Sequence, residues 1–343
     1  METQLKAVDQ PVKLLQLTAL GEAGEVVKIH KGHISTINAD EVLVAMEAAP
    51  IHISDILMIT GRYGIKPSFP AVLGAEGIGR VIAIGSSVNS EWHGKRVVIL
   101  PYYEQGTWAS HIVLPLKNIV QVSESADATQ LAQMTINAMT AYLSLREYAK
   151  LMPGDWIGQT AANSAVGQYV IGFAKMAGMK TLNIVRRKEA GEFVSGLGGD
   201  AVVVIGEYLE EQIEKILDGK QLSLVLDTVG GQLVGQIAKF LKSRSAIVGY
   251  SSESGQTPAI APFDLFYRRL SYHGFWVIDW FKTTPKTEID TVIYQLNEML
   301  DTGKLSATVG GTYSIDQYKE AFASAMKGGR PGKIFFTFNQ STL

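Results

Sequence analysis

Three consecutive cationic side chains, those of Arg186, Arg187 and Lys188, stand directly after the apolar segment 181–185. A turn of small and polar residues, 160–164, precedes them and opens a segment in which apolar side chains recur at helical spacing. The first backbone N–H groups of a helix have no intrahelical partner, and they stabilise a phosphate. A guanidinium grips a second phosphate bidentately. The pattern therefore predicts a site for a ligand that carries phosphate at two places.

The elements around this turn indicate the class of ligand. The segment 156–159 is typical of a buried parallel strand, and apolar side chains recur from Val166 to Ala177 as in a helix that packs on a sheet. The segment 181–185 predicts the next buried strand. A strand–turn–helix–strand unit binds a dinucleotide, whose pyrophosphate lies at the start of the helix. The residues expected to bind it are Asn163, Ser164, Ala165, Val166 and Gly167.

The glycine fingerprint of dinucleotide sites is incomplete in this turn. Gly167 is its last glycine, and Ser164 and Ala165 take the earlier places. A protein that prefers NAD places an acid about 20 residues further on, where a carboxylate binds the ribose hydroxyls. Arg186 and Lys188 stand there instead, and a guanidinium favours a 2′-phosphate. The predicted cofactor is therefore NADPH, and the alternative is a solvated basic strand end.

Composition limits the remaining possibilities. The 343-residue chain is long enough for two domains, and its 46% hydrophobic and 19% charged residues are usual for a globular protein. A net charge of −2 argues against a nucleic-acid surface, and no apolar run reaches the ~18 residues of a membrane helix. The chain has no cysteine and six scattered histidines, so no metal site is expected. The N-terminal segment lacks a targeting pattern, and we expect a cytoplasmic protein.

Residues 1–126 are rich in β-branched side chains and punctuated by glycine and proline, as in a folded-over β domain. The strands expected there are 12–17, 26–29, 41–48, 79–84 and 96–100.

Residues 127–273 have a different pattern. A helix is expected at 128–148, and short apolar strands then alternate with helices, which is typical of a doubly wound parallel sheet. These strands are expected at 156–159, 181–185, 201–205, 222–226 and 246–249. Residues 274–343 would return to the first domain through helices near 288–300 and 317–326 and a strand at 332–338.

The chain carries four short motifs: Gly74-Ala75-Glu76-Gly77, Asn137-Ala138-Met139-Thr140-Ala141-Tyr142, Pro153-Gly154-Asp155 and Leu226-Asp227-Thr228-Val229-Gly230-Gly231. Together they resemble the motifs of the medium-chain dehydrogenase/reductase superfamily. The resemblance implies an α/β fold in which a Rossmann doubly wound parallel sheet is inserted in a GroES-like β-rich catalytic domain. Zinc-dependent members carry His in place of Ala75 and a cysteine cluster further on. This chain has neither, which implies a zinc-free reductase.

Within the superfamily, the chain most resembles the NADPH-dependent 2-enoyl thioester reductases of fatty-acid synthesis. The matching segments are 163–168, 181–186 and 274–276, whereas His52-Ile53 replaces the family's Asn-Pro and Leu57 replaces an Asn. The resemblance implies hydride transfer to the β-carbon of an α,β-unsaturated carbonyl. Quinone reductases share the scaffold and a Gly-x-Tyr like Gly61-Arg62-Tyr63, so a quinone is the alternative substrate.

The resemblance also implies the catalytic residues. Tyr63 would donate to the carbonyl oxygen and supply a proton, because a phenol is neutral near pH 7; otherwise its ring packs in a loop. Trp276 would line the cleft between the domains, or make a simple apolar contact. His52 would hydrogen-bond the nicotinamide amide or the substrate, or lie partly exposed in a loop.

Further residues are expected to contact the cofactor or to shape turns. Thr140, Tyr250 and Phe275 would be cofactor contacts by their position in the family. Asp55 and Glu76 are expected to cap turns rather than to act as general acids.

The apolar segment 271–281 bears on assembly. An exposed apolar edge strand is an aggregation hazard, so we expect a two-fold homodimer in which this edge meets its copy. A protein that senses NADPH without turnover is the remaining alternative. In such a protein, Tyr63 and Trp276 would turn away from the nicotinamide.

Overall fold

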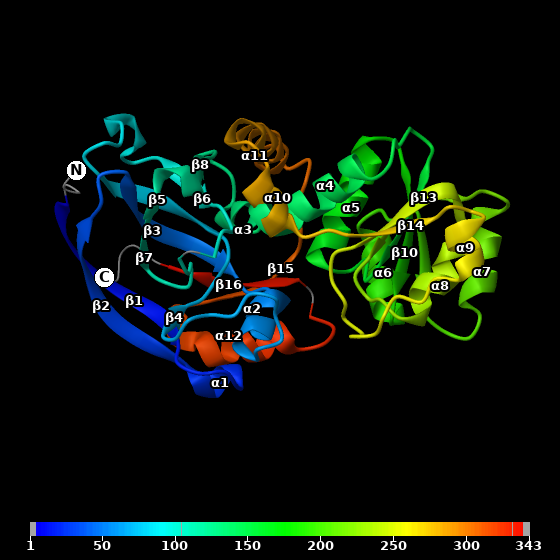
Figure 1. The fold of residues 1–343 in the computed structure, drawn as a ribbon, viewed down its shortest axis with the longest axis horizontal. Coiled ribbons are helices and arrows are strands. Elements are labelled where there is room, and N and C mark those ends of the chain that lie inside the picture. The colour runs from blue at the N-terminus through cyan, green and yellow to red at the C-terminus, as the bar shows by residue number, and fades with distance from the viewer. Residues whose placement is uncertain (1–4, 104, 331, 339–343) are drawn as a thin grey trace. The chain divides into compact units, whose positions relative to one another are not determined.

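The computed structural model describes residues 5–103, 105–330 and 332–338 (Figure 1). The chain divides into two units: unit 1 comprises Met1–Ile136 and Ile278–Leu343, and unit 2 comprises Asn137–Val277. The limits predicted from the sequence were residues 126 and 273. Within the described ranges, no helix is both long and apolar enough to cross a membrane.

Unit 2 is built on a six-stranded parallel sheet with strand order β11-β10-β9-β12-β13-β14. Its strands are β9 (Trp156–Thr160), β10 (Lys180–Val185), β11 (Ala201–Val204), β12 (Leu222–Asp227), β13 (Leu241–Gly249) and β14 (Ser271–Gly274). The doubly wound sheet predicted from the apolar runs is confirmed, although β13 begins at Leu241 rather than Ala246. The strand order reverses between β9 and β12, which is the point where such sheets bind ligands.

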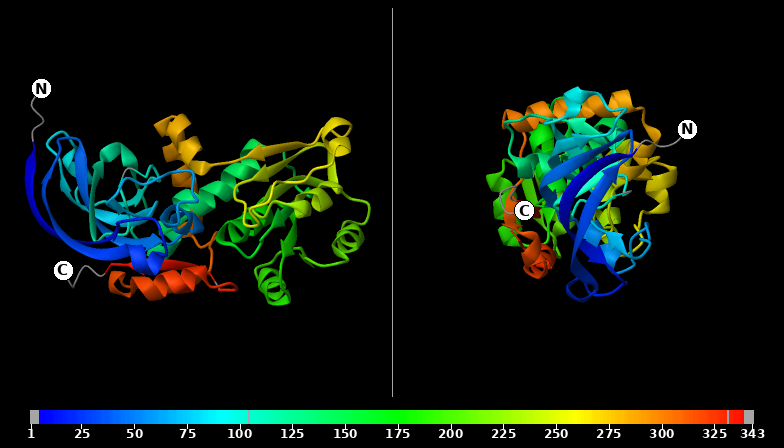
Figure 2. Two further views of the ribbon diagram at one scale, coloured as in Figure 1. Left: turned by 60° about the horizontal axis from the view of Figure 1, so that its bottom comes forward. Right: turned by 90° about the vertical axis from the view of Figure 1, so that its left-hand side faces the viewer.

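Helices cover both faces of this sheet (Figures 1 and 2). They are α4 (Met139–Glu147), α5 (Ala165–Met176), α6 (Lys188–Gly196), α7 (Leu209–Leu217), α8 (Gln232–Ala238) and α9 (Pro262–Phe266). α5 buries Val166, Val170 and Phe173, the apolar face expected from their spacing, whereas Ala177 lies exposed just past the end of the helix.

Unit 1 contains two β-sheets. The three-stranded sheet has the order β2-β1-β4, and the seven-stranded sheet has the order β15-β16-β3-β5-β6-β8 with β7 also paired to β3. Their strands are β1 (Lys6–Leu17), β2 (Val27–Ile37), β3 (Glu41–Pro50), β4 (Ala71–Val72), β5 (Gly77–Ile84), β6 (Arg96–Ile99), β7 (His111–Pro115), β8 (Ile119–Gln121), β15 (Val309–Tyr313) and β16 (Lys333–Thr337). The five strands expected before residue 126 are all present. The terminal strand β16 pairs with β3, which confirms that the chain end returns to the first domain.

The helices of unit 1 are short except for one. They are α1 (Ala23–Val26), α2 (Ile53–Ile59), α3 (Ala128–Ala132), α10 (Val277–Thr283), α11 (Lys286–Asp301) and α12 (Tyr318–Met326). Helical turns η1 (Ser90–Trp92), η2 (Leu116–Asn118), η3 (Met134–Ala138) and η4 (Ile315–Gln317) connect other elements. α12 packs on β16 and contacts α1, so a segment from the first part of the chain and one from the last part lie side by side in unit 1 (Figure 2). Trp108 fills the core beneath α12, with its ring 5.4 Å from those of both Phe322 and Phe336.

Two sequence predictions need correction. The single helix expected at 128–148 is interrupted: α3 ends at Ala132, the wider π-turn η3 follows, and only then does α4 begin. The segment 271–281 is not an exposed apolar edge strand. β14 ends at Gly274, and Phe275 beyond it is buried; α10 then turns Val277, Ile278 and Phe281 inward.

Candidate active site

The turn between β9 and α5 has the geometry expected of a phosphate-binding turn. Ser164 is the N-cap of α5, and its side-chain oxygen accepts a hydrogen bond from the Gly167 amide at 3.1 Å. Gln168 ties the turn to the helix by donating to the Asn163 carbonyl at 3.2 Å. The next N–H groups of the helix, those of Ala165 and Val166, lie in its first turn, where the helix itself supplies no acceptor. Asn163, Ser164, Ala165, Val166 and Gly167 are thus brought together in one turn.

Gly167 is required by close packing in this turn. A Cβ at this position would lie 2.4 Å from the Ala162 carbonyl oxygen and 2.8 Å from Ala162 Cα. Both atoms belong to the backbone, so a side chain would force the helix away from the turn. The surviving glycine of the fingerprint therefore keeps the amides of the helix start next to the loop.

A buried hydrogen-bond network organises the neighbouring loop, which follows β12. Thr160 Oγ1 donates to Asp227 Oδ1 at 2.9 Å and accepts from the Thr228 amide at 2.9 Å. The other Asp227 oxygen accepts from the Gly230 amide at 3.0 Å, and Gly230 has a φ of +77° that favours glycine. The network fixes the loop after β12 relative to β9, at the point where the strand order reverses.

Tyr250 follows β13 and lies, like the loop after β12, at the carboxyl ends of the strands. Its amide donates to the Asp227 carbonyl at 3.1 Å, and its hydroxyl oxygen is buried. Burial raises the pKa of this phenol, and the negative charges of Asp227 and Glu253 add to the rise. Tyr250 therefore stays a neutral hydrogen-bond donor next to the loop that Asp227 organises.

The basic residues after β10 are exposed. Arg186 and Arg187 form no ion pair among the described residues, and Lys188 lies 3.8 Å from Glu192 one turn along α6. Solvated cations at the carboxyl end of a strand next to β9 suit a phosphorylated ribose. The turn and this basic strand end together fit NADPH, and Arg186 and Lys188 would hold its 2′-phosphate.

The remaining cofactor candidates of unit 2 differ in exposure. Thr140 is buried in α4. Phe275 is buried too: its amide donates to the Gly249 carbonyl at 2.8 Å, and its ring meets Tyr148 edge to face at 6.2 Å. Trp276 keeps 42% of its surface exposed, so its indole is accessible on unit 2.

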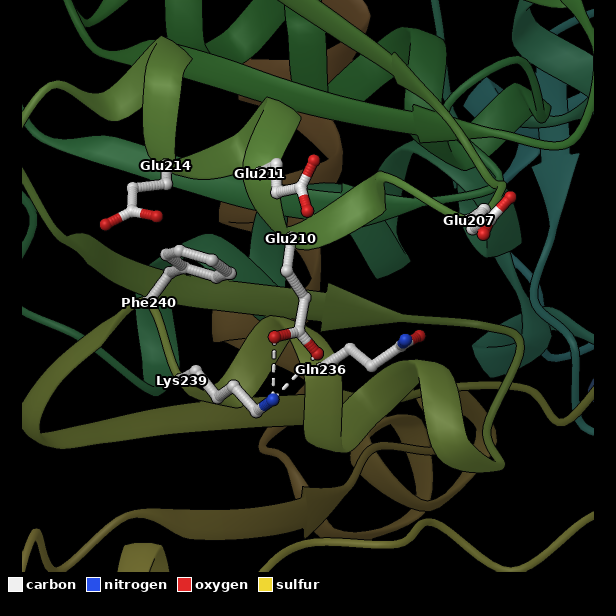
Figure 3. Close-up of a pocket in the computed structure, with 7 residues that line it drawn as sticks. All are labelled: Glu207, Glu210, Glu211, Glu214, Gln236, Lys239 and Phe240. Carbon is white, nitrogen blue, oxygen red and sulfur yellow. Dashed lines mark hydrogen bonds and ion pairs between the residues drawn. The ribbon is translucent and has the colours of Figure 1, made fainter.

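A surface pocket of unit 2 has the wrong charge for this cofactor (Figure 3). Figure 3 shows its lining of four glutamates with one lysine, the latter bound to Glu210 at 2.7 Å; the residues are Glu207, Glu210, Glu211, Glu214, Gln236, Lys239 and Phe240. A dinucleotide phosphate would be repelled there, since carboxylates outnumber the cation.

In unit 1, a cluster of ionisable side chains is buried around His52, the N-cap of α2. His52 Nε2 lies 2.7 Å from Glu76 Oε1, and Lys333 Nζ lies 3.2 Å from His52 Nδ1. An ammonium can only donate a hydrogen bond, so His52 Nδ1 is the acceptor. The ring proton is therefore on Nε2, which donates a hydrogen bond to Glu76. Burial, followed by the charges of Lys333 and Arg330, holds the pKa of His52 well below its usual range. His52 is therefore a neutral link between Lys333 and Glu76.

Glu76 is satisfied in either protonation state. Its Oε2 accepts from Thr135 Oγ1 at 2.7 Å and from the Ile136 amide at 2.8 Å. When the carboxyl is protonated, its O–H donates to Thr135 Oγ1, whose own proton turns to the Ile99 carbonyl at 3.2 Å. Burial raises the pKa of Glu76 to about 8.

Asp55 lies beside this cluster and caps α2. Its Oδ2 accepts from the His52 amide at 2.7 Å, as the sequence predicted for a capping residue, while its Oδ1 is buried without a hydrogen-bond partner in the described chain. Burial raises the pKa of Asp55 to about 7, against the opposing effects of this amide and of Lys333. A zinc ion does not fit the cluster, because the lone pair of His52 Nδ1 that would bind it already accepts a hydrogen bond from the Lys333 ammonium.

Tyr63 follows α2 in a loop that turns at Gly61, whose φ is +72°. The Tyr63 amide donates to the Leu57 carbonyl at 3.1 Å, and its partly buried ring lies 6.1 Å from the ring of Tyr103 at 44°. Tyr103 was not predicted as a site residue; the tandem Tyr102-Tyr103 is the sequence signal that could have indicated it. An apolar cavity of about 640 Å³, which Met58 and Leu73 help to line, also includes Tyr103 in its wall.

A doubly wound parallel sheet with a tight turn into a helix at its switch point, in one chain with a β-rich unit, is typical of nucleotide-dependent oxidoreductases of the dehydrogenase/reductase type. Comparisons agree: residues 38–124 match the alcohol dehydrogenase GroES-like domain, and residues 165–293 match the zinc-binding dehydrogenases. The chain is 32% identical over 312 residues to the mitochondrial enoyl-[acyl-carrier-protein] reductase of Rattus norvegicus, which covers 90% of this chain and 83% of that protein. It therefore belongs to the enoyl-[acyl-carrier-protein] reductase family within the medium-chain dehydrogenase/reductase superfamily.

Solved structures share the fold over 96% of this chain and 100% of theirs. The Etr1p/NADP/crotonyl-CoA complex matches with a TM-score of 0.85 at 24% identity. A protein of Bacillus thuringiensis described as an NADPH:quinone reductase matches with a TM-score of 0.88, also at 24% identity. Among the described residues, no three His, Asp or Glu side chains are grouped to hold a metal ion.

Proposed function

We propose that this protein is an NADPH-dependent reductase whose substrate is a trans-2-enoyl thioester. The observation that carries the proposal is its 32% identity to the enoyl reductase of Rattus norvegicus across 90% of the chain. When bound, NADPH supplies the hydride that goes to the β-carbon of the substrate. The residues proposed to hold it are Thr140, Asn163, Ser164, Ala165, Val166, Gly167, Arg186, Lys188, Tyr250 and Phe275.

Tyr63 is proposed as the residue that serves the substrate's carbonyl. Negative charge develops on this oxygen as the hydride arrives, so a donor aimed at it lowers the barrier. The Tyr63 phenol would donate a hydrogen bond to that oxygen and then give its proton to the α-carbon. Trp276 is proposed to contact the nicotinamide or the substrate through its exposed indole.

The proposed role of His52 is indirect. Both of its ring nitrogens are engaged, by Glu76 and by Lys333. Its ring therefore supports the loop that begins α2, and it would reach the cofactor or substrate only if one of these contacts opened.

A quinone is the second candidate substrate. The Bacillus thuringiensis protein with the same fold is described as a quinone reductase, and a quinone needs less help at its oxygen because it is already electrophilic. The apolar cavity beside Tyr103 favours the enoyl thioester, since it offers room for an acyl chain.

Assembly and location are also proposals. β14 is an edge strand of the sheet, and the neighbouring α9 exposes Phe263, Phe266 and Tyr267 at 61%, 71% and 78%. A homodimer through this edge would cover them and pair the strand. A cytoplasmic location stays our proposal, although the relatives are named as mitochondrial; cell fractionation decides it.

One experiment tests the proposed reaction. NADPH oxidation by the wild-type protein is measured with crotonyl-coenzyme A, a longer enoyl thioester and a simple quinone. We expect turnover of both thioesters to exceed that of the quinone. Quinone reduction without thioester reduction would overturn the proposal in favour of the second candidate.

A further inference from the structure

The cavity of about 640 Å³ beside Tyr103 belongs entirely to unit 1. Its volume lies within the range of small-molecule sites, about 300–1,000 Å³. Apolar side chains from β1, β2, β7 and the loop after α2 form most of its wall, among them Val12, Ile34 and Val113. Such a wall suits an alkyl chain, because removing apolar surface from water is favourable.

The cavity begins next to the proposed catalytic tyrosine. Ile65, which follows Tyr63 by two residues, lines it, and so does Tyr103, whose ring lies 6.1 Å from that of Tyr63. All three side chains also pack against the same hydrophobic core. A substrate whose carbonyl is held by Tyr63 can therefore place its acyl chain in this cavity.

A histidine in the wall has one ring nitrogen without a hydrogen-bond partner among the residues that the structure describes. His111 opens β7 and shares a face of that strand with Val113, which also lines the cavity. Only 7% of its surface is exposed. Its Nδ1 lies 3.1 Å from Ser110 Oγ, whereas its Nε2 is the nitrogen that has no described partner.

The hydrogen bonds of Ser110 determine which nitrogen of His111 carries the proton. Ser110 Oγ accepts from the Lys13 amide at 3.0 Å, and its own O–H has His111 Nδ1 as its one acceptor in the described chain. Nδ1 therefore accepts, and the ring proton lies on Nε2. Burial lowers the pKa of His111, so the ring is neutral near pH 7. The wall of the cavity thus contains a neutral N–H donor.

Gln105 supplies a second donor in the same wall. Its side-chain nitrogen is buried and has no hydrogen-bond partner in the described part of the chain. A buried donor that stays unpaired destabilises whatever covers it, so a plain alkyl chain is a poor occupant beside these groups. Lys66 and Ser68 also line the cavity, but both are exposed and stay hydrated.

We propose that His111 and Gln105 select enoyl thioesters whose acyl chain carries a neutral oxygen, that of a ketone or a hydroxyl group. The proposal rests on the proposed function and names the class of substrate for that site. Tyr63 serves the thioester carbonyl, the chain lies in the cavity, and the oxygen on the chain accepts hydrogen bonds from His111 Nε2 and the Gln105 amide. A neutral oxygen suits these neutral donors, whereas a buried carboxylate would need a charged partner.

The test uses a series of trans-2-enoyl-coenzyme A thioesters of one chain length. One member is unsubstituted, and each of the others carries a single keto group, moved stepwise along the chain away from the double bond. The kcat/KM of each is measured with NADPH. At one position of the keto group we expect wild type to prefer the keto substrate by about tenfold or more, since a site built to bind an oxygen rejects the analogue that lacks it.

Two variants remove the donors one at a time. His111→Phe keeps a flat ring, and Gln105→Leu keeps a side chain of similar size. In each, the preference should fall by about fivefold or more through the KM of the keto substrate. The kcat/KM of the unsubstituted thioester should rise, because its chain no longer covers an unpaired donor. His93→Phe is the matched control: His93 is exposed, so this variant should keep the preference.

The outcomes separate this inference from the proposed function. A wild type that reduces the thioesters without preferring any keto position overturns the inference alone, and so does a preference that survives in both variants. If one variant loses turnover of every substrate, the other variant decides. A wild type that reduces no enoyl thioester overturns the proposed function and this inference with it.

Discussion

Replacing Glu76 by Gln removes one titrating group from the buried cluster of unit 1, and its effect on stability depends on pH. Burial raises the pKa of Glu76 from 4.5 to about 8. Between these values the folded protein holds a proton that the unfolded chain releases. The contribution of Glu76 to stability is therefore complete below its unfolded pKa and is lost as pH rises through the folded one.

The magnitude follows from the pKa values of the cluster. Between about pH 6.5 and about pH 8, Glu76 lowers the free energy of unfolding by on the order of 2 kcal/mol, and Asp55, with a pKa of about 7, lowers it by on the order of 1 kcal/mol. Lys333 has a pKa lowered to about 8, so it opposes this fall by less than about 1 kcal/mol. His52 stays neutral throughout. We therefore expect wild type to lose on the order of 2 kcal/mol and Glu76→Gln less than about 1 kcal/mol.

Hydrogen exchange of amides in β3 and β16 measures this loss in unit 1 itself, because both strands flank the cluster. The readout is the change in the free energy of unfolding between about pH 6.5 and about pH 8. The glutamine of Glu76→Gln pairs less well with His52 than Glu76 does, but this lowers stability equally at both pH values and cancels in the difference. Glu124→Gln is the control: its exposed carboxylate pairs with Arg80 at 2.7 Å, and its pKa is lowered, so its charge is constant in this range. An equal loss in Glu76→Gln and wild type would refute the assignment of this titration to Glu76.

Three further predictions concern cofactor binding and assembly. Arg186→Ala should raise the KM for NADPH by about tenfold or more and leave NADH use little changed, since a charged hydrogen bond contributes about 1.5–3 kcal/mol; equal losses with both cofactors would mean that Arg186 is structural. Gly167→Ala should weaken NADPH binding by at least about tenfold in a fluorescence titration, because its Cβ would meet the Ala162 carbonyl, whereas Gly196→Ala, which meets nothing within 4 Å, should bind normally. Light scattering at micromolar concentration should give the mass of a dimer, and a monomeric mass would rule out the homodimer.

Local sequence patterns predicted the fold well for elements whose burial is set by neighbouring residues in the sequence. Burial is nearly continuous along β9, β10 and β12, because central parallel strands are buried on both faces, and apolar residues therefore dominate these segments. The interruption at η3 and the inward turn of α10 were missed, because both depend on packing against segments far away in the sequence. An apolar run alone does not reveal whether a strand or a helix buries it.

The candidate site shows the same limit. The turn around Ser164 and Gly167 was found because its residues are contiguous. The cluster of His52, Glu76 and Lys333 joins residues up to 281 positions apart, so no local spacing in the sequence could predict it. From the sequence alone, Lys333 is indistinguishable from an exposed strand residue. In the structure, β16 pairs with β3, and Lys333 is buried beside α2.

The central claim, that Tyr63 serves the carbonyl of an enoyl thioester, is tested most directly by Tyr63→Phe, which keeps the ring and removes only the hydroxyl. The rates with an enoyl thioester and with a simple quinone are measured on the same preparation, with NADPH binding as the control. The thioester rate should fall by about 10²–10⁴-fold, the quinone rate much less, and NADPH binding should be retained. A wild type that reduces quinones but no enoyl thioester, together with a silent Tyr63→Phe, would contradict the claim.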